Sequence, residues 1–449
     1  MVSDFAIDLQ WTASLCPQEG RDEIRHTASQ LTMTLKGSVV TKNEDDWARS
    51  VKDYALVSLY PVALWFASSW WRILYEPSPE NSRTAEWRMN HELIAAGYGY
   101  IWPNICFASD GVNLSVQAFS SLSEIYGPTR YLVSEQAVVA LPDFKRTLGG
   151  FIRTVIARLE LYGLFETDLQ VIWKEVAEEE NDSVKSEFRR LEACLGFDPD
   201  TAPKEFVEDL LSLSKDVGIA GLTEVACSRP FDENQIKHIQ DILRLSRRND
   251  VGIVGKIDLR ERMECVRERM NDQKSTPWEL GWRIARAFRK DAGWYNRPLK
   301  DEDLESVLNI PARHLLGEKL QEYYPSVGLG IRENGGEYIR FHFQKRNNRA
   351  RRFEAARFMA DSIFSRTEDK WLPITNAKTF RQKVQRAFAA ELLCPIEELK
   401  KQFSCRNYSE DDINDAADYF EVSPFVVQGL LVNTQTVSKE SIASYLNEA

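Results

Sequence analysis

The feature that most constrains the fold is a change in the spacing of apolar residues near residue 140. In residues 5–11 and 31–35, apolar and polar side chains alternate, which is the pattern of half-buried β-strands. From residue 144 to residue 162, apolar side chains instead recur every three or four positions, which is the pattern of an amphipathic helix. We therefore expect sheets with some helices first and mostly helices afterwards.

Turn residues and charge divide the chain further. Asp110-Gly111 predicts the turn of a hairpin over residues 104–119, and Asn334-Gly335 predicts a second hairpin. A highly charged stretch that ends in turn residues predicts a boundary before residue 276. The predicted fold class is α+β. We expect an N-terminal Trp-rich α+β domain over residues 1–140 and a helical region over residues 141–275. A C-terminal α+β domain follows over residues 276–405, and a helix-turn-helix-like tail covers residues 406–449.

An uncharged run of 18 residues, Tyr54–Trp71, approaches the ~20 residues that a membrane-spanning helix needs. It contains Pro61, and Asp53 and Arg72 bracket it directly. We therefore expect a buried helix that begins near Pro61 and no membrane association; contact with a membrane interface is the less favoured alternative. The Trp residues in and near this run are expected in the core rather than at an interface. They are Trp65, Trp70, Trp71, Trp87 and Trp102.

The composition limits partners, compartment and cofactors. The 449-residue chain has a formal net charge of −11, so its surface as a whole repels nucleic-acid phosphate. None of the seven cysteines belongs to a Cys-x-x-Cys pair, and the first residues lack the basic and apolar regions of a signal peptide. These features predict a cytoplasmic location with mostly buried thiols. The sequence has no nucleotide-binding loop and no Gly-x-Ser-x-Gly motif, so we predict no cofactor and no catalytic residue.

Three segments in the last third of the chain carry a family resemblance. They are RRFEAARFMAD at 351–361, AFAAELLCP at 387–395 and INDAADYFEVSPFVVQGLL at 413–431. Following a predicted helix and hairpin, they resemble the ImmA/IrrE-like family of zinc metallopeptidases over residues 277–431. The resemblance implies a metallopeptidase-like domain with a metal-binding helix, a second helix with a Phe-Ala-Ala-x-x-Leu-x-Pro signature, and a helix-turn-helix-like tail.

Carried over residue by residue, the resemblance implies a degenerate site. Arg357 and Asp361 stand where the family has the two His ligands of its His-Glu-x-x-His motif. Phe358 stands at the general-base Glu, and Gln382 stands at the third ligand, which is a Glu in active members. A guanidinium has no lone pair for a metal ion, and a phenyl ring cannot take a proton from bound water. Only Asp361 could ligate, so we expect no metal ion and no peptidase activity.

Two arrangements of the replaced site stay open. Arg357 and Asp361 are four residues apart, so their side chains would be neighbours on a helix. They could form an ion pair that Gln382 joins, with Phe358 filling the former metal cavity. Alternatively, both charges could face solvent.

The five histidines do not suggest another metal site, because no two of them lie three or four residues apart. His91-Glu92 matches half of the zinc-binding motif, but Ala95 stands at the position of the second His, so we interpret the match as accidental. His342 is expected on the outer face of a strand, at the surface.

A run of six cations without an acid is a candidate surface for an anionic partner. A solvated loop is the simpler alternative. The six residues are Arg340, Lys345, Arg346, Arg349, Arg351 and Arg352. The second tail helix lacks cations and the first carries several acids, so the tail is expected to be structural or protein-binding rather than a DNA reader.

These features favour a non-catalytic pseudopeptidase that acts as a protein-interaction or regulatory subunit. The resemblance implies a bacterial stress, defence or mobile-element system as its setting. We expect a protein partner, while nucleic acid is not favoured. The alternatives are a nucleic-acid-associated regulator or complex subunit that uses the basic run 340–352, and an active hydrolase with an unrecognised site.

Overall fold

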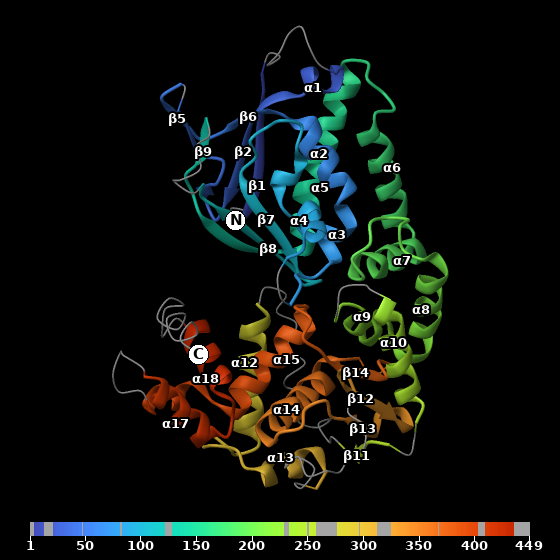
Figure 1. Cartoon of the computed structure of the whole chain (residues 1–449), viewed down its shortest axis with the longest axis vertical. Helices are drawn as coiled ribbons and strands as arrows, with labels where there is room; N and C mark the ends of the chain where they lie inside the picture. Colours follow the sequence, from blue (N-terminus) through green and yellow to red (C-terminus); the bar gives the residue numbers. More distant parts are fainter. Residues whose placement is uncertain are drawn as a thin grey trace. The chain divides into compact units, whose positions relative to one another are not determined.

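The structure of the protein is a computed structural model, drawn in Figure 1. It describes residues 4–12, 21–46, 48–80, 83–121, 128–228, 233–248, 251–256, 276–295, 297–311, 325–366, 368–402 and 409–434. Contacts between Cα atoms divide the chain into two compact units. Unit 1 consists of Met1–Leu211 with Arg229–Phe231 and Ala377–Thr379, and unit 2 consists of Ser212–Ser228, Asp232–Asn376 and Phe380–Ala449.

Unit 1 combines antiparallel sheets with helices. One sheet has the order β1-β2-β3 with β6 also paired to β2, a second has the order β10-β8-β7, and a third has the order β5-β4-β9. The strands are β1 (Phe5–Trp11), β2 (Ala28–Leu35), β3 (Ser38–Val39), β4 (Asn43–Asp45), β5 (Ser50–Lys52), β6 (Ala55–Ser58), β7 (Asn104–Ser109), β8 (Asn113–Phe119), β9 (Thr129–Tyr131) and β10 (Glu135–Ala140). The helices are α1 (Asp22–His26), α2 (Leu59–Ser68), α3 (Trp70–Tyr75), α4 (Ala85–His91), η1 (Leu93–Ala96), α5 (Leu141–Leu161), α6 (Asp168–Asn181) and α7 (Ser183–Cys194). Helix α8 (Lys204–Val217) contains the division between the units.

The first predicted hairpin is confirmed by the pairing of β7 with β8, from Asn104↔Phe119 to Ser109↔Leu114. Its turn is closed by Asp110, whose Oδ1 accepts hydrogen bonds from the backbone N–H groups of Val112 at 3.1 Å and Asn113 at 2.8 Å. Gly111 has φ +88°, a conformation that glycine adopts without steric cost.

The uncharged run folds into β6, α2 and the start of α3, within the core of unit 1. The five named Trp residues are all at most 9% exposed, which confirms that they belong to the core. Trp70 Nε1 donates to Glu180 Oε1 at 3.1 Å, and Trp71 Nε1 donates to Glu179 Oε2 at 2.8 Å, so carboxylates of α6 satisfy both indoles. The expected buried helix near Pro61 is also confirmed, since α2 begins at Leu59. Among the described residues, no helix has the length and apolar character that crossing a membrane requires.

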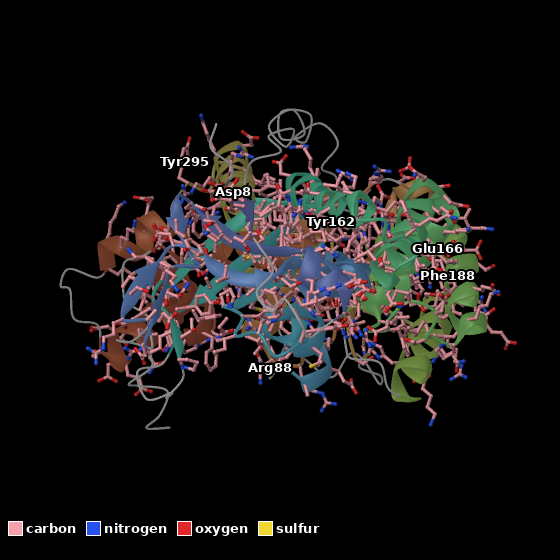
Figure 2. All side chains as sticks on the ribbon, turned by 90° about the horizontal axis from the view of Figure 1, so that it is seen from above. Asp8, Arg88, Tyr162, Glu166, Phe188 and Tyr295 are labelled. Carbon is pink, nitrogen blue, oxygen red and sulfur yellow. The ribbon has the colours of Figure 1, made fainter. Side chains whose placement is uncertain are left out.

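The predicted change of period is confirmed at α5, whose buried side includes Phe144, Leu148 and Val155. Tyr162, which follows the last residue of α5 and is labelled in Figure 2, stacks on His26 with ring centroids 4.1 Å apart. This contact holds the end of α5 against α1.

Unit 2 is built on an antiparallel sheet of order β11-β13-β12-β14, and α15 packs beside both α12 and α14 (Figure 1). Its strands are β11 (Ile253–Gly255), β12 (Gly328–Glu333), β13 (Tyr338–His342) and β14 (Trp371–Ile374). Its helices are α9 (Ile219–Ala226), α10 (Glu233–Ser246), α12 (Pro277–Asp291), α13 (Asp301–Leu308), η3 (Asn334–Gly336), α14 (Asn348–Phe364), α15 (Phe380–Leu393), α16 (Ile396–Gln402), α17 (Glu410–Phe420) and α18 (Pro424–Asn433). The second predicted hairpin is therefore confirmed as β12, η3 and β13, and the α+β class is confirmed.

The predicted helical region 141–275 is shared between the two units. Helices α5, α6 and α7 belong to unit 1, whereas α9, α10 and β11 belong to unit 2, where β11 pairs with β13. Apolar periodicity shows which face of a helix is buried but not which core covers that face. The predicted tail 406–449 likewise contributes Ile413, Phe420 and Leu431 to the core cluster that contains α14 and α15. The predicted boundary before residue 276 falls on residues that the structure does not describe.

The cysteines that the structure describes are buried, as expected; they are Cys106, Cys194, Cys227 and Cys394. Burial raises the pKa of the Cys106 thiol to about 11, so this thiol is protonated near neutral pH and is a poor nucleophile. Cys16, Cys265 and Cys405 lie outside the described residues.

Candidate functional site at the predicted metal position

Helix α14 is the element that the resemblance assigns to metal binding, and it is buried along its length. Asn347 caps its first turn by accepting a hydrogen bond from Ala350 N at 2.8 Å. Buried residues then occur on every side of the helix, charged residues among them. One side of α14 packs on the sheet through Phe358, and another faces α15 through Arg357 and Asp361. A helix placed between two layers has no solvent face, so its charges need partners inside the protein.

Arg357 is 6% exposed, and its Nη2 is held by three oxygen atoms. It donates to Thr375 O at 2.7 Å, to Gln382 Oε1 at 2.5 Å and to Gln385 Oε1 at 3.2 Å. Both glutamines also donate to the backbone, Gln382 Nε2 to Pro373 O at 3.0 Å and Gln385 Nε2 to the same oxygen at 3.3 Å. The guanidinium is therefore clamped between α15 and the end of β14. Gln382 thus contacts Arg357, whereas the first predicted arrangement had it join an ion pair between Arg357 and Asp361.

Asp361 forms its ion pair with a residue that the sequence reasoning missed. Its carboxylate is fully buried and accepts two hydrogen bonds from Arg381 on α15, Nε to Oδ1 at 2.6 Å and Nη2 to Oδ2 at 2.8 Å. Neither predicted arrangement is therefore right: Asp361 pairs with Arg381 rather than Arg357, and neither charge faces solvent. The i,i+4 rule describes pairs within one helix, whereas this pair joins two helices.

Phe358 packs on the sheet rather than beside the Arg357 guanidinium. Its ring centroid lies 5.1 Å from that of Phe341 and 5.6 Å from that of Phe343. Successive residues on a helix point about 100° apart, so Phe358 and Arg357 face different layers. Phe358 thus fills the core between α14 and the β-sheet.

Burial is the largest single influence on the pKa values of Arg357, Arg381 and Glu354. Burial, together with the positive charge of Arg386, lowers the pKa of Arg357 to about 9, which leaves the guanidinium protonated near pH 7. Burial alone would lower the pKa of Arg381, but the carboxylate of Asp361 raises it above its ordinary value. Glu354, one turn before Arg357, accepts hydrogen bonds from Gln344 N at 2.9 Å and Lys345 N at 3.0 Å, while burial raises the pKa of this carboxyl. The predicted metal position therefore holds a cation with carboxylates nearby.

The six cations of the basic run do not form one exposed patch, which corrects the expectation of an anion-binding surface. Arg351 is fully buried, donates to Lys345 O at 2.8 Å and lies over the Phe343 ring. Arg352 is also fully buried and forms ion pairs with Asp301 and with Glu421, the latter at 3.0 Å. Of the remaining four, Arg340 binds Glu333 and Arg349 binds Asp418, whereas Lys345 and Arg346 are exposed. Neighbours in sequence point in different directions here, and three of the six cations pair with acids from other parts of unit 2.

The structure corrects the surface position expected for His342, which is 1% exposed. The backbone of Gly252 packs directly on the His342 ring, because a Cβ at position 252 would stand only 2.8 Å from Cε1 of that ring. Burial and the nearby charge of Arg340 lower the pKa of His342 to about 4. The strand alternation correctly separated His342 from the Phe341 face, but other parts of unit 2 cover the second face of the sheet as well.

His91 serves the structure of unit 1. Its Nδ1 lies 2.9 Å from Phe107 O, its Nε2 lies 2.9 Å from Glu76 Oε2, and its ring stacks on Trp87. The adjacent Glu92 binds Arg88, which is labelled in Figure 2, at 2.9 Å. Within the described residues, no group of three or more His, Cys, Asp and Glu side chains could hold a metal ion.

The edge of the sheet next to the Arg357 cluster is covered. Lys370 N, just before β14, donates to Val217 O at 3.0 Å, and α9 packs across Trp371. Gly221 makes this approach possible, because a Cβ at that position would stand 2.7 Å from Trp371 O. The backbone of β14 is therefore paired with β12 on one side and lies against α9 on the other.

Comparisons with family models, with curated proteins and with solved structures found no match to this chain. The resemblance to the ImmA/IrrE-like family stays a prediction from the motifs.

Proposed function

We propose that the chain is a non-catalytic pseudopeptidase that acts as a protein-interaction or regulatory subunit. The observation that carries this proposal is the environment of Arg357. Gln382 and Gln385 hold its guanidinium where the resemblance places the metal ligands. A protonated guanidinium repels a zinc ion and offers it no lone pair, so this cluster has no means to activate a water molecule for peptide hydrolysis.

The covered edge of β14 supports the proposal independently. A free sheet edge is a common place for an extended peptide to bind, because it offers unpaired backbone groups. At β14 a peptide strand would have to displace α9, which packs on Trp371 across Gly221. We therefore expect a partner to bind elsewhere on the chain.

The setting that the resemblance implies is the cytoplasm of a bacterium, in a stress, defence or mobile-element system. The partner in this proposal is a protein. The nucleic-acid alternative is not favoured, since only Lys345 and Arg346 of the basic run are exposed and the net charge of the chain is −11.

One contact supports a second candidate function, a hydrolase with an unrecognised site. The Ser326 hydroxyl lies 2.7 Å from Nδ1 of His238 on α10, a separation that suits a nucleophile and its general base. Labelling with a fluorophosphonate probe tests this candidate. Labelling that Ser326→Ala abolishes would support it, and an unlabelled wild-type chain would exclude it.

The main proposal is tested by a peptidase assay and by affinity capture. We expect the purified chain to cleave no member of a peptide library, with or without added zinc chloride. We expect the tagged chain to retain a defined protein from a lysate of its host at constant stoichiometry. Metal-dependent cleavage, or capture of no protein at all, would contradict the proposal.

A further inference from the structure

The last described helix, α18, carries large apolar side chains on its outward side as well as on its inward side, with Gln428 between the outward ones. Its inward residues Val427, Leu430 and Leu431 belong to the core of unit 2. Its outward residues follow helical spacing and include Phe425, which is 73% exposed, and the half-buried Val432. A surface helix normally has polar residues on its outward side, so a Phe exposed there is unusual and suits a contact with a partner.

Gly429 lies on this outward side, one turn after Phe425. A Cβ at this position would meet nothing within 4 Å, so packing against the described residues does not explain why position 429 is a glycine. Glycine inside a helix is about 1 kcal/mol less favourable than alanine. A bare backbone between two apolar side chains would allow the backbone of another helix to approach closely.

The charge on the neighbouring helix α17 indicates what kind of partner would cover this side of α18. Helix α17 precedes α18 and packs against it, and its exposed side is acidic up to Tyr419, which is 49% exposed. Asp412 accepts a hydrogen bond from Ser409 N at 2.9 Å and Asp418 binds Arg349, so these two acids have roles within the chain. No described cation forms an ion pair with the other acids, Glu410, Asp411 and Asp415.

We propose that the α17–α18 surface, defined by Glu410, Asp411, Asp415, Tyr419, Phe425 and Gly429, binds a basic amphipathic helix of a partner protein. The apolar side of the partner helix covers Phe425 and crosses at Gly429. Its lysine or arginine residues lie opposite the acids of α17, which give the complex its specificity and a salt-sensitive rate of association. Phosphate-rich partners are repelled by the same acids. This inference rests on the proposed function as a protein-interaction subunit and assigns its surface.

The direct test measures the binding of a defined probe to the full chain by fluorescence anisotropy. The probe is a helical peptide of leucine and lysine with the leucines on one face, and its matched control has glutamate in place of lysine. We expect the lysine peptide alone to bind. Phe425→Ser and Gly429→Gln should each weaken its binding about tenfold or more, as expected for the centre of an interface. Asp411→Asn with Asp415→Asn should reduce the salt dependence of binding.

Matched variants on unit 1 test whether the probe binds the α17–α18 surface specifically or binds any exposed acidic or apolar residue of the chain. Val184 is 70% exposed, and Glu175 and Glu178 are exposed acids on α6. We expect Val184→Ser and the pair Glu175→Gln with Glu178→Gln to bind the lysine peptide as the wild type does. Equal binding of both peptides, or equal weakening by the unit 1 variants, would overturn the inference. A dimer that Phe425→Ser dissociates would assign the surface to a second copy of this chain instead.

Affinity capture separates a failure of this inference from a failure of the proposed function. If the wild type and Phe425→Ser retain the same host protein equally well, the α17–α18 surface is wrong while the proposed function stands. If the wild type retains no protein, both fail. Thermal unfolding of each variant shows that the loss of binding does not come from loss of the fold.

Discussion

Replacing Asp361 with Asn removes the negative charge from one end of a buried ion pair and leaves its shape almost unchanged. The Asp361 carboxylate is fully buried, and the Arg381 side chain that binds it through two hydrogen bonds is 13% exposed. Removing one member of such a pair leaves the other charge buried without compensation, which costs about 3–5 kcal/mol. Asp369 Oδ2 lies 3.9 Å from Arg381 Nη1 and would retain part of the compensation, so we expect a loss near the low end, about 3 kcal/mol.

Hydrogen exchange followed by mass spectrometry measures this loss where it occurs. A loss of about 3 kcal/mol corresponds to exchange about a hundredfold faster in the peptides of α14 and α15, while peptides of unit 1 such as α5 should not change. Combining Asp361→Asn with Arg381→Met removes both buried charges and should recover most of the protection. Arg130→Gln breaks an exposed pair with Glu44 and should cost less than about 1 kcal/mol. If Asp361→Asn exchanges at wild-type rates in α14 and α15, the buried ion pair does not exist.

Two further perturbations test the packing around the site. The pKa of His342 is lowered to about 4 in the fold, against about 6.5 when unfolded, so between these values the unfolded chain binds more protons and stability falls as the pH falls. Urea titrations should show that the wild type loses about 2 kcal/mol more than His342→Phe between pH 7 and pH 5; parallel pH profiles would refute the buried neutral imidazole. Gly221→Val should lower the thermal midpoint, since a Cβ there stands 2.7 Å from Trp371 O and forces α9 from β14 at a cost of about 2 kcal/mol or more. Gly429→Ala is its matched control and should raise stability by about 0.5–1 kcal/mol, because that position is open; equal thermal midpoints for both glycine variants would show that α9 does not press on β14.

Patterns within one element were predictable from the sequence. The change of period at residue 144 located α5, and Asp110-Gly111 and Asn334-Gly335 located both hairpins, because spacing and turn chemistry act over a few residues. The motif resemblance also predicted that Gln382 would lie close to Arg357, and the two side chains are hydrogen-bonded.

Contacts between elements were not predictable in the same way. The pair between Asp361 and Arg381 depends on how α14 and α15 lie side by side, and the spacing along one helix does not contain that information. The basic run shows the same limit, because Arg351 and Arg352 point inward although their sequence neighbours Lys345 and Arg346 are exposed. His342 shows that alternation along a strand separates two faces of a sheet but does not tell which of them a further layer covers.

The claim that the Arg357 guanidinium takes the place of a metal ion is tested most directly by the zinc content of the full chain. Wild type and Asp361→Asn are each incubated with zinc chloride, dialysed, and measured by inductively coupled plasma mass spectrometry. We expect the same content in both, well below one ion per chain, because a buried cation and two glutamines offer zinc no site. One zinc ion per wild-type chain that Asp361→Asn loses would contradict the claim.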